Sequence, residues 1–160
     1  MIDPFLLADK DVPGKWHCYF KSARAGILRS TSLDLKSWTP AGKTSGGENP
    51  SVIVDGGEYV LSYSPEDNGI GMKRSKNGVN WRDEGLLKLG QGEWPWAAGR
   101  ITAGFMLDLR NDPRVGKVLM VFHGSDFPES DPRGGFDNFA NIGIAWSDDL
   151  RNWSWPASRP

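Results

Sequence analysis

The sequence has little of the features that mark several large classes of protein. Its single cysteine, Cys18, cannot form a disulfide within the chain, and its apolar neighbours predict a buried thiol. No apolar run approaches the ~18 residues of a membrane-spanning helix, and no secretory signal is visible. The net charge is −1 with both signs interspersed, so we expect neither nucleic acid nor a membrane as a partner. The location is therefore unknown, with the cytoplasm as the default.

The 160 residues also lack Ala-, Leu- and Glu-rich stretches with a helical period. They contain instead 20 glycines, 11 prolines and 8 tryptophans. Apolar bursts of about four to eight residues are separated by Gly, Asp and Pro, which is typical of short strands joined by tight turns. This composition favours an all-β fold, and the length suits one domain with its own core.

One heptapeptide occurs three times, as Ser32–Trp38, Ser75–Trp81 and Ser147–Trp153. Each copy has Ser, one variable residue, Asp or Asn, and then Trp four positions later. Asp and Asn favour turns because their side chains accept hydrogen bonds from nearby backbone N–H groups, and the Trp ring offers a large apolar surface for packing. We interpret each copy as the turn between the third and fourth strands of a repeated unit, with a structural role.

The repeated unit is a meander of four strands, and it fits three times into a single domain, 1–160. The units extend approximately over 1–41, 42–86 and 87–160, and the third is longer because of an insertion between Ser125 and Ala140. A period of about 40 to 50 residues with four strands per unit is typical of propeller blades. The predicted fold class is therefore all-β and propeller-like, with three four-stranded antiparallel blades.

Specific motifs add a family resemblance to this repeat. The opening IDPF (Ile2–Phe5), the stretch ENPSVI (Glu48–Ile53) and the heptapeptide together resemble the five-bladed propeller glycoside hydrolases. These are the arabinanase and xylosidase type of family 43 and the related invertase and levansucrase type, and the resemblance extends over nearly the whole chain. It implies hydrolysis of furanoside or xyloside glycans at the mouth of a central channel, where the innermost strand of each blade starts. Three carboxylates carry the chemistry in that family.

Asp3, Glu48 and Glu93 are the candidate catalytic residues that the resemblance implies. Asp3 matches the general base or nucleophile. Glu48 and Glu93 both have the E-x-P spacing of the general acid, and the sequence alone does not decide which of them is the acid. Glycoside hydrolysis needs one protonated and one ionised carboxyl group, so we expect the three residues to converge on one axis. The simpler alternatives are a turn acid before Pro4 and two solvated glutamates.

Aromatic residues give a second, weaker indication of a sugar site. The rings of Trp94, Trp96 and Phe127 suit the apolar faces of a sugar, although the two tryptophans can equally serve blade packing. His123 has no His, Cys or carboxylate at metal-binding spacing, so no metal site and no cofactor are expected. Asp108 and Asp112 flank a segment that we interpret as a turn.

Three blades are fewer than a closed propeller needs. An open array leaves one sheet face uncovered at each end, where the apolar strands FLLA (Phe5–Ala8) and FMLDL (Phe105–Leu109) meet water. We therefore expect a homodimer that closes a six-bladed ring. The alternative function is a catalytically inactive carbohydrate-binding or assembly module that retains the scaffold.

Overall fold

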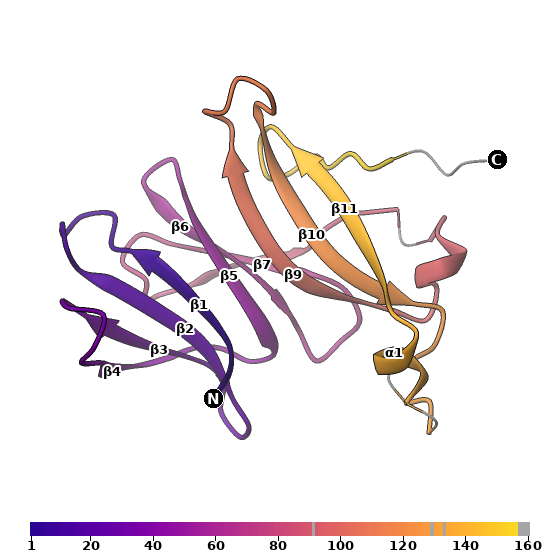
Figure 1. Cartoon of the computed structure of the whole chain (residues 1–160), viewed down its shortest axis with the longest axis horizontal. Coiled ribbons are helices and arrows are strands. Elements are labelled where there is room, and N and C mark those ends of the chain that lie inside the picture. The colour runs from indigo at the N-terminus through magenta and orange to yellow at the C-terminus, as the bar shows by residue number, and fades with distance from the viewer. Residues whose placement is uncertain (91, 129, 133, 157–160) are drawn as a thin grey trace.

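The computed structural model describes residues 1–90, 92–128, 130–132 and 134–156, and it is built almost entirely of strands (Figure 1). The strands are β1 (Ile2–Ala8), β2 (Trp16–Ser22), β3 (Gly26–Ser32), β4 (Thr39–Ser45), β5 (Glu48–Asp55), β6 (Glu58–Ser64), β7 (Gly71–Ser75), β8 (Arg82–Leu86), β9 (Arg100–Leu109), β10 (Lys117–Ser125) and β11 (Asn141–Ser147). Two short helical segments, η1 (Pro95–Ala97) and α1 (Gly135–Asn138), precede β9 and β11. None of the helices among the described residues is long and apolar enough to span a membrane.

The strands form three antiparallel sheets that follow one another along the chain. Their orders are β1-β2-β3-β4, β5-β6-β7-β8 and β9-β10-β11. Figure 1 shows the sheets side by side, with the second between the first and the third. The first strand of the middle sheet, β5, contacts both β1 and β9. This arrangement confirms the all-β, propeller-like fold, with the leading strand of each sheet in the inner position.

The heptapeptide forms the turn that the sequence predicts. In the first copy, Ser32 Oγ accepts hydrogen bonds from the N–H groups of Asp34 and Leu35, at 3.2 and 2.9 Å. Asp34 Oδ1 in turn accepts from the N–H groups of Lys36 and Ser37, at 2.8 and 2.7 Å. The second and third copies repeat this pattern. The first two copies join the third strand of a sheet to the fourth, which confirms their structural role.

The same turn imposes a left-handed backbone on one residue of each copy. Leu35, Gly78 and Leu150 occupy this position with φ values of 60°, 68° and 62°. Residues with a side chain adopt this region at a cost, because Cβ approaches a carbonyl oxygen. Leu150 is buried in the core, whereas Leu35 is 46% exposed. The first turn therefore carries a strained leucine whose side chain is only partly buried.

The tryptophans of the three turns differ in burial, although the sequence suggests one role for all. Trp153 is 7% exposed and belongs to the core between the second and third sheets. Trp81 is half-buried and packs edge-on against Tyr19, with ring centroids 6.2 Å apart. Trp38 is half-buried and lies outside both core clusters. The expectation of a buried ring is thus correct for the third copy and only partly correct for the others.

The core consists of two clusters, each between neighbouring sheets. Tyr19, Ile27, Val52, Tyr59, Leu61 and Tyr63 form the cluster between the first and second sheets. A larger cluster lies between the second and third sheets, and its members include Val60, Ile70, Ile101, Met106, Met120 and Trp153. Polar contacts also join the second and third sheets. Ser51 Oγ, on β5, accepts a hydrogen bond from the N–H of Met106, on β9, at 2.9 Å. Asp55 also forms an ion pair with Arg110 at 2.7 Å.

The third sheet departs from the prediction of four strands in every blade. Within the described residues it has three strands, and the fourth is reduced to one bridge between Trp146 and Ser154. Beyond the bridge, Trp155 packs edge-on against Trp94, with ring centroids 5.6 Å apart. Pro156 follows and has no N–H group for a ladder. The segment therefore leaves β11 after a single pair of hydrogen bonds.

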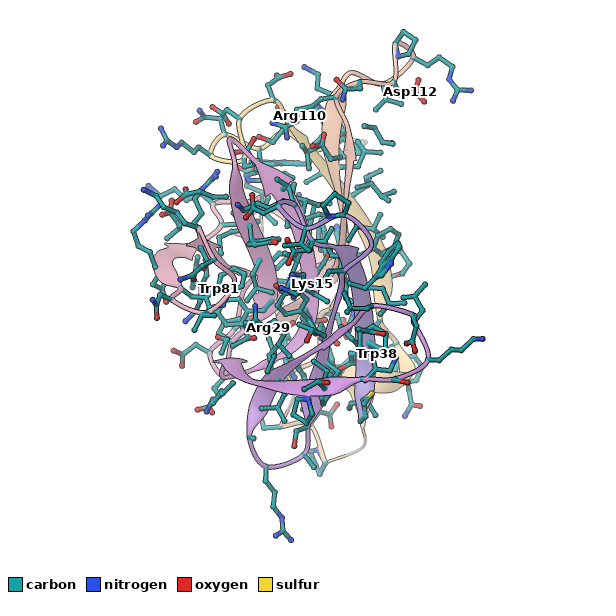
Figure 2. The ribbon with its side chains drawn as sticks, turned by 90° about the vertical axis from the view of Figure 1, so that its left-hand side faces the viewer. Lys15, Arg29, Trp38, Trp81, Arg110 and Asp112 are labelled. Carbon is teal, nitrogen blue, oxygen red and sulfur yellow. The ribbon has the colours of Figure 1, made fainter. Side chains whose placement is uncertain are left out.

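Apolar side chains are exposed on the leading strands of the two terminal sheets. Ile2 and Leu6 of β1 are 55% and 51% exposed, and Phe105 and Leu107 of β9 are 42% and 39% exposed. These side chains alternate with the inward-facing residues of their strands. By contrast, the β9–β10 turn is polar and projects from one end of the molecule with Asp112, as predicted (Figure 2).

Candidate functional site

The starts of β1 and β5 share an unusual backbone geometry. Asp3 and Asn49 both have φ of 52°, both precede a proline, and both lie at an irregularity in the strand pairing. Asp and Asn tolerate this left-handed conformation better than other residues with a side chain. Asn49 thus occupies in the second sheet the position that Asp3 occupies in the first. The second sheet presents an amide where the first presents a carboxylate.

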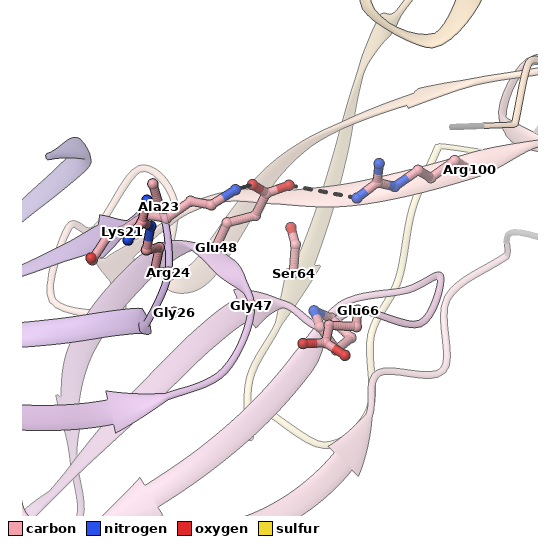
Figure 3. A pocket seen from close by; sticks show the side chains of 11 residues that line it. Lys21, Ala23, Arg24, Gly26, Gly47, Glu48, Ser64, Glu66 and Arg100 are labelled. Carbon is pink, nitrogen blue, oxygen red and sulfur yellow. Dashed lines mark hydrogen bonds and ion pairs between the residues drawn. The ribbon is translucent and has the colours of Figure 1, made fainter. Parts of the chain in front are cut away.

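A pocket of about 340 Å³ lies at this end of the sheets (Figure 3). Its lining comes from the β2–β3 turn, the entry to β5, the segment after β6 and the start of β9. Its charged residues are Lys21, Arg24, Glu48, Glu66 and Arg100.

Glycine is required where the chain passes from β4 to β5 beside this pocket. A Cβ on Gly47, whose φ is 77°, would stand 2.1 Å from the carbonyl oxygen of Ser64. A Cβ on Gly26 would stand 2.6 Å from the carbonyl oxygen of Ser45. The glycines therefore allow the close approach of backbone segments that forms this wall.

Glu48 lies at the centre of the charged residues. One of its carboxylate oxygens forms an ion pair with Lys21, and the other lies 3.6 Å from Arg100 Nη2 (Figure 3). Lys21 is on β2, directly opposite Ile2 of β1, and Arg100 is the first residue of β9. The Glu48 side chain is 25% exposed and that of Arg100 is 9% exposed. Glu48 therefore links all three sheets at the pocket, through ion pairs that are partly shielded from water.

Arg100 also contacts the segment that follows β10. Its guanidinium carbon lies 4.7 Å from the centre of the Phe136 ring, in the short helix α1. Such a cation–π contact helps to fix the orientation of the side chain. Arg100 thus stands at the start of the leading strand of the third sheet, at the position where the resemblance leads one to expect an acid.

Asp3 lies at the same end of the sheets as Glu48, because its neighbour Ile2 pairs with Lys21. Its side chain is half-buried, and within the described residues it forms no ion pair or hydrogen bond. Asp3 does not itself line the pocket around Glu48. The structure therefore brings Asp3 and Glu48 to neighbouring strand starts without a direct contact between them.

Glu93 lines a different pocket, of about 650 Å³, together with Trp94 and Trp96. The E-x-P motif of Glu93 leads into η1, and β9 begins only at Arg100. This motif therefore does not begin an inner strand. Trp94 is 5% exposed, and its ring stacks on those of Trp96 and Phe122, with centroids 5.5 Å away in each case. Trp94 is a core residue, and Trp96 is half-buried beside it. The two glutamates consequently do not share a pocket.

Phe127 lies in the long segment between β10 and β11. Its ring is half-buried and packs on Phe139, with centroids 5.6 Å apart. The backbone of Phe127 approaches Gly99 so closely that a Cβ on this glycine would stand 2.4 Å from it. Phe127 lines neither of the two pockets described above. It instead fixes this segment near the start of β9.

A buried polar cluster lies at the opposite end of β1 from the pocket. Asp9 accepts hydrogen bonds from Lys15 and His17, both at 2.9 Å, and Tyr59 of the second sheet lies 3.4 Å from the same ring nitrogen of His17. Burial alone raises the pKa of Asp9, but these hydrogen bonds and two from backbone N–H groups hold it well below its usual range. Burial lowers the pKa of His17. This cluster joins the first two sheets and takes no part in the pocket.

No group of three or more His, Cys, Asp or Glu side chains is placed to hold a metal ion in the part of the chain that the structure describes. The charged groups of the pocket itself are the carboxylates and cations given above. Sequence reasoning missed Lys21 and Arg100, whose partner Glu48 is distant in the chain.

Comparison with known proteins shows the fold but no close relative. No protein-family model matches the chain. No curated protein matches its sequence. Solved structures do match, among them an endo-arabinase from Bacteroides thetaiotaomicron, with a TM-score of 0.69 and 16% identity over 96% of this chain and 53% of that one. An α-L-arabinofuranosidase from Clostridium thermocellum matches with a TM-score of 0.56 and 15% identity, over 96% of this chain and 71% of that one.

A β-fructofuranosidase of glycoside hydrolase family 32 from Bombyx mori shares the same architecture. Its TM-score is 0.63 at 18% identity, over 90% of this chain and 32% of that one. The chain has the β-propeller fold of family 43 and family 32 glycoside hydrolases, as the sequence motifs suggest. It spans about half the length of the endo-arabinase, 53%.

Proposed function

We propose that the chain is a glycoside hydrolase-like unit that binds furanoside or xyloside glycans in the pocket around Glu48. The observation that carries this proposal is the position of Glu48, which is ion-paired to Lys21 and Arg100 where β1, β5 and β9 start. The solved structures of the same fold include an arabinanase and an arabinofuranosidase. A pocket with several charged and hydroxyl groups suits the hydroxyls of a sugar.

In this proposal Asp3 and Glu48 are the catalytic pair. Asp3 activates water or attacks the sugar carbon, and Glu48 donates a proton to the leaving oxygen. Lys21 and Arg100 position the Glu48 carboxylate. Substrate entry has to replace one of these ion pairs, because a general acid donates from a protonated oxygen. Glu93, which lines the other pocket, has no role in this pair.

The alternative is carbohydrate binding without hydrolysis. Two observations bear on it: cations engage both oxygens of Glu48, and Asn49 presents an amide at the position equivalent to Asp3. The ion-paired Glu48 and the amide of Asn49 can each form hydrogen bonds with a sugar without any proton transfer. The two functions share one pocket, so a single set of variants separates them.

The test is hydrolysis of nitrophenyl arabinofuranoside and xyloside by the purified chain. We expect Glu48→Gln and Asp3→Asn each to lower turnover by about 10²-fold or more. Asp3→Asn should leave the melting temperature nearly unchanged, whereas Glu48→Gln should lower it, because it weakens the ion pairs with Lys21 and Arg100. Glu84→Gln is the matched control, because Glu84 lies on β8 and pairs with Arg82. If the chain binds these sugars but hydrolyses none, the binding alternative is correct. If it neither binds nor hydrolyses them, the proposed function is wrong.

We infer further that a second copy of the chain covers the exposed faces of the first and third sheets. The support is the exposure of apolar side chains on both leading strands, including Leu6 and Phe105 at 51% and 42%. Soluble monomers seldom expose extensive apolar patches. Light scattering should therefore give a dimer, and Phe105→Lys should give a monomer. Val79→Lys is the control, since Val79 is 56% exposed in a turn. A monomer at every concentration would contradict the inference.

A further inference from the structure

Within the described residues, the outer edge of the third sheet has no strand like those that cover this edge in the other two sheets. β4 pairs along β3, and β8 pairs along β7. On the outer side of β11, Trp146 alone has a partner among the described residues, Ser154, with which it exchanges two hydrogen bonds of 2.8 Å. The first part of β11, from Asn141 to Ala145, is therefore an open edge in the described structure.

The direction of the backbone groups on this edge follows from the Trp146 bridge. In an antiparallel ladder, residues that exchange hydrogen bonds with one neighbour alternate with residues that exchange them with the other. The backbone N–H and C=O groups of Trp146 point away from β10, towards Ser154. Those of Ile144 and Ile142, two and four residues earlier, therefore point away from β10 as well. Their N–H and C=O groups form no hydrogen bond within the described residues. Their side chains are 39% and 77% exposed.

The aromatic pocket of about 650 Å³ lies beside this edge and is lined by Ile142, Gly143 and Ile144 as well as by Trp94, Trp96, Phe122 and Trp155. Gly143 faces the aromatic rings, because a Cβ on it would stand 2.4 Å from the Phe122 ring and 2.8 Å from that of Trp96. At Gly143 the strand thus contributes backbone and no side chain to the wall. Glu93 is the charged residue of the lining.

We propose that an extended peptide segment of a partner protein binds here as the fourth strand of the third sheet. It runs antiparallel to β11 and exchanges hydrogen bonds with Ile142 and Ile144. A bulky apolar side chain of the peptide lies opposite Gly143 and enters the aromatic pocket. A Lys or Arg two residues away, whose side chain is on the same face of the strand, pairs with Glu93. Such strand addition obtains affinity from the backbone and specificity from alternate side chains.

A second copy of this chain is a poorer occupant of the same edge. Pairing of β11 with its own copy around Gly143 would place glycine against glycine and leave the aromatic pocket unfilled. The edge also lacks the charged residues and prolines that commonly prevent strand addition, since its sequence is Asn141-Ile-Gly-Ile-Ala. A peptide with a large central side chain uses both the open backbone groups and the pocket.

The probe is a fluorescein-labelled peptide of alternating Val and Thr with a central Trp and a Lys two residues from it, and its binding is measured by fluorescence polarisation. Ile142→Pro removes the outward N–H of Ile142 without removing a bond to β10, and Pro is tolerated on sheet edges. We expect this change to weaken binding about tenfold. Ile142→Val is the matched control and should bind as the original chain does. Glu93→Gln should weaken binding of this peptide but not of one with Leu in place of Lys.

A second arm keeps the test valid if Ile142→Pro fails to fold. N-methylation of the peptide residue next to the central Trp blocks a bond to β11, whereas N-methylation of the Trp itself does not, because its N–H points away. The first peptide should bind about tenfold more weakly than the second. Absence of saturable binding up to about millimolar peptide would overturn the proposal. Equal binding of the two methylated peptides would also overturn it. So would self-association of the chain that is abolished by Ile142→Pro, because a second copy of the chain would then occupy the β11 edge. The result is independent of sugar binding, which uses the other pocket.

Discussion

Replacement of Trp153 by Ala tests how the repeated turn contributes to stability. Trp153 is 7% exposed and packs in the core between the second and third sheets. Truncation of a buried aromatic residue to Ala typically costs about 3–5 kcal/mol. The indole N–H of Trp153 has no hydrogen-bond partner among the described residues. Removal of such a buried, unpaired donor offsets about 1 kcal/mol of the loss in unfolding free energy. We therefore expect a net loss of about 2–4 kcal/mol of unfolding free energy.

The other copies of the turn provide the comparison. Trp38 is only half-buried and lies outside both core clusters. Trp38→Ala should consequently cost less, about 1–2 kcal/mol, because less apolar area returns to water. Trp153→Phe is the matched control, since it keeps most of the ring and removes the unpaired N–H. Its cost should stay near 1 kcal/mol or below.

Urea unfolding followed by near-ultraviolet circular dichroism measures these differences, provided that the slope of free energy against urea is unchanged. A loss of 2–4 kcal/mol is a large part of the ~5–15 kcal/mol that stabilises a typical domain. Equal losses for Trp38→Ala and Trp153→Ala would refute the difference in packing. A loss below about 1 kcal/mol for Trp153→Ala would show that this ring is not in the core.

Three further predictions concern the turns and the contact between sheets. Leu35→Gly relieves a left-handed leucine and should raise stability by up to about 1 kcal/mol, measured by thermal melting; a fall would contradict the strain. Backbone N–H groups lower the pKa of Asp34 to about 2. The ionised carboxylate therefore contributes fully to the free energy of unfolding above about pH 4, and this contribution is lost as the pH falls towards 2. Asp34→Asn should reduce the acid sensitivity of unfolding in that window, and an unchanged profile would refute this. Asp55→Asn weakens the ion pair with Arg110 across the second and third sheets and should cost about 1–2 kcal/mol in urea unfolding, with Asp112→Asn in the exposed turn as a neutral control.

Most strands could be predicted because each has a local pattern that fixes it. The bounds of β10 and β11 coincide with the apolar bursts Lys117–Ser125 and Asn141–Ser147, between segments rich in Gly, Asp and Pro. The missing fourth strand of the third sheet could not be predicted in this way. Within the described residues, one bridge is followed by the packing of Trp155 against Trp94, a tertiary contact that local sequence does not reveal.

The candidate site was predictable only where a motif coincides with a strand start. ENP precedes a strand directly, so Glu48 lies in the pocket. EWP has the same spacing, but η1 intervenes before β9, and Glu93 therefore lines another pocket. Lys21 and Arg100 escaped prediction because only the packing of neighbouring sheets brings them to Glu48.

We propose that the pocket around Glu48 binds a glycan, and an NMR titration with an arabinofuranose oligosaccharide measures this binding. Backbone amide signals report binding whether or not hydrolysis follows. We expect saturable shifts for Gly26, Gly47 and Ser64, which line this pocket, and none for Gly143, which lines the aromatic pocket. Shifts confined to Gly143 and its neighbours, or no shifts at about millimolar sugar, would show that the pocket around Glu48 does not bind the glycan.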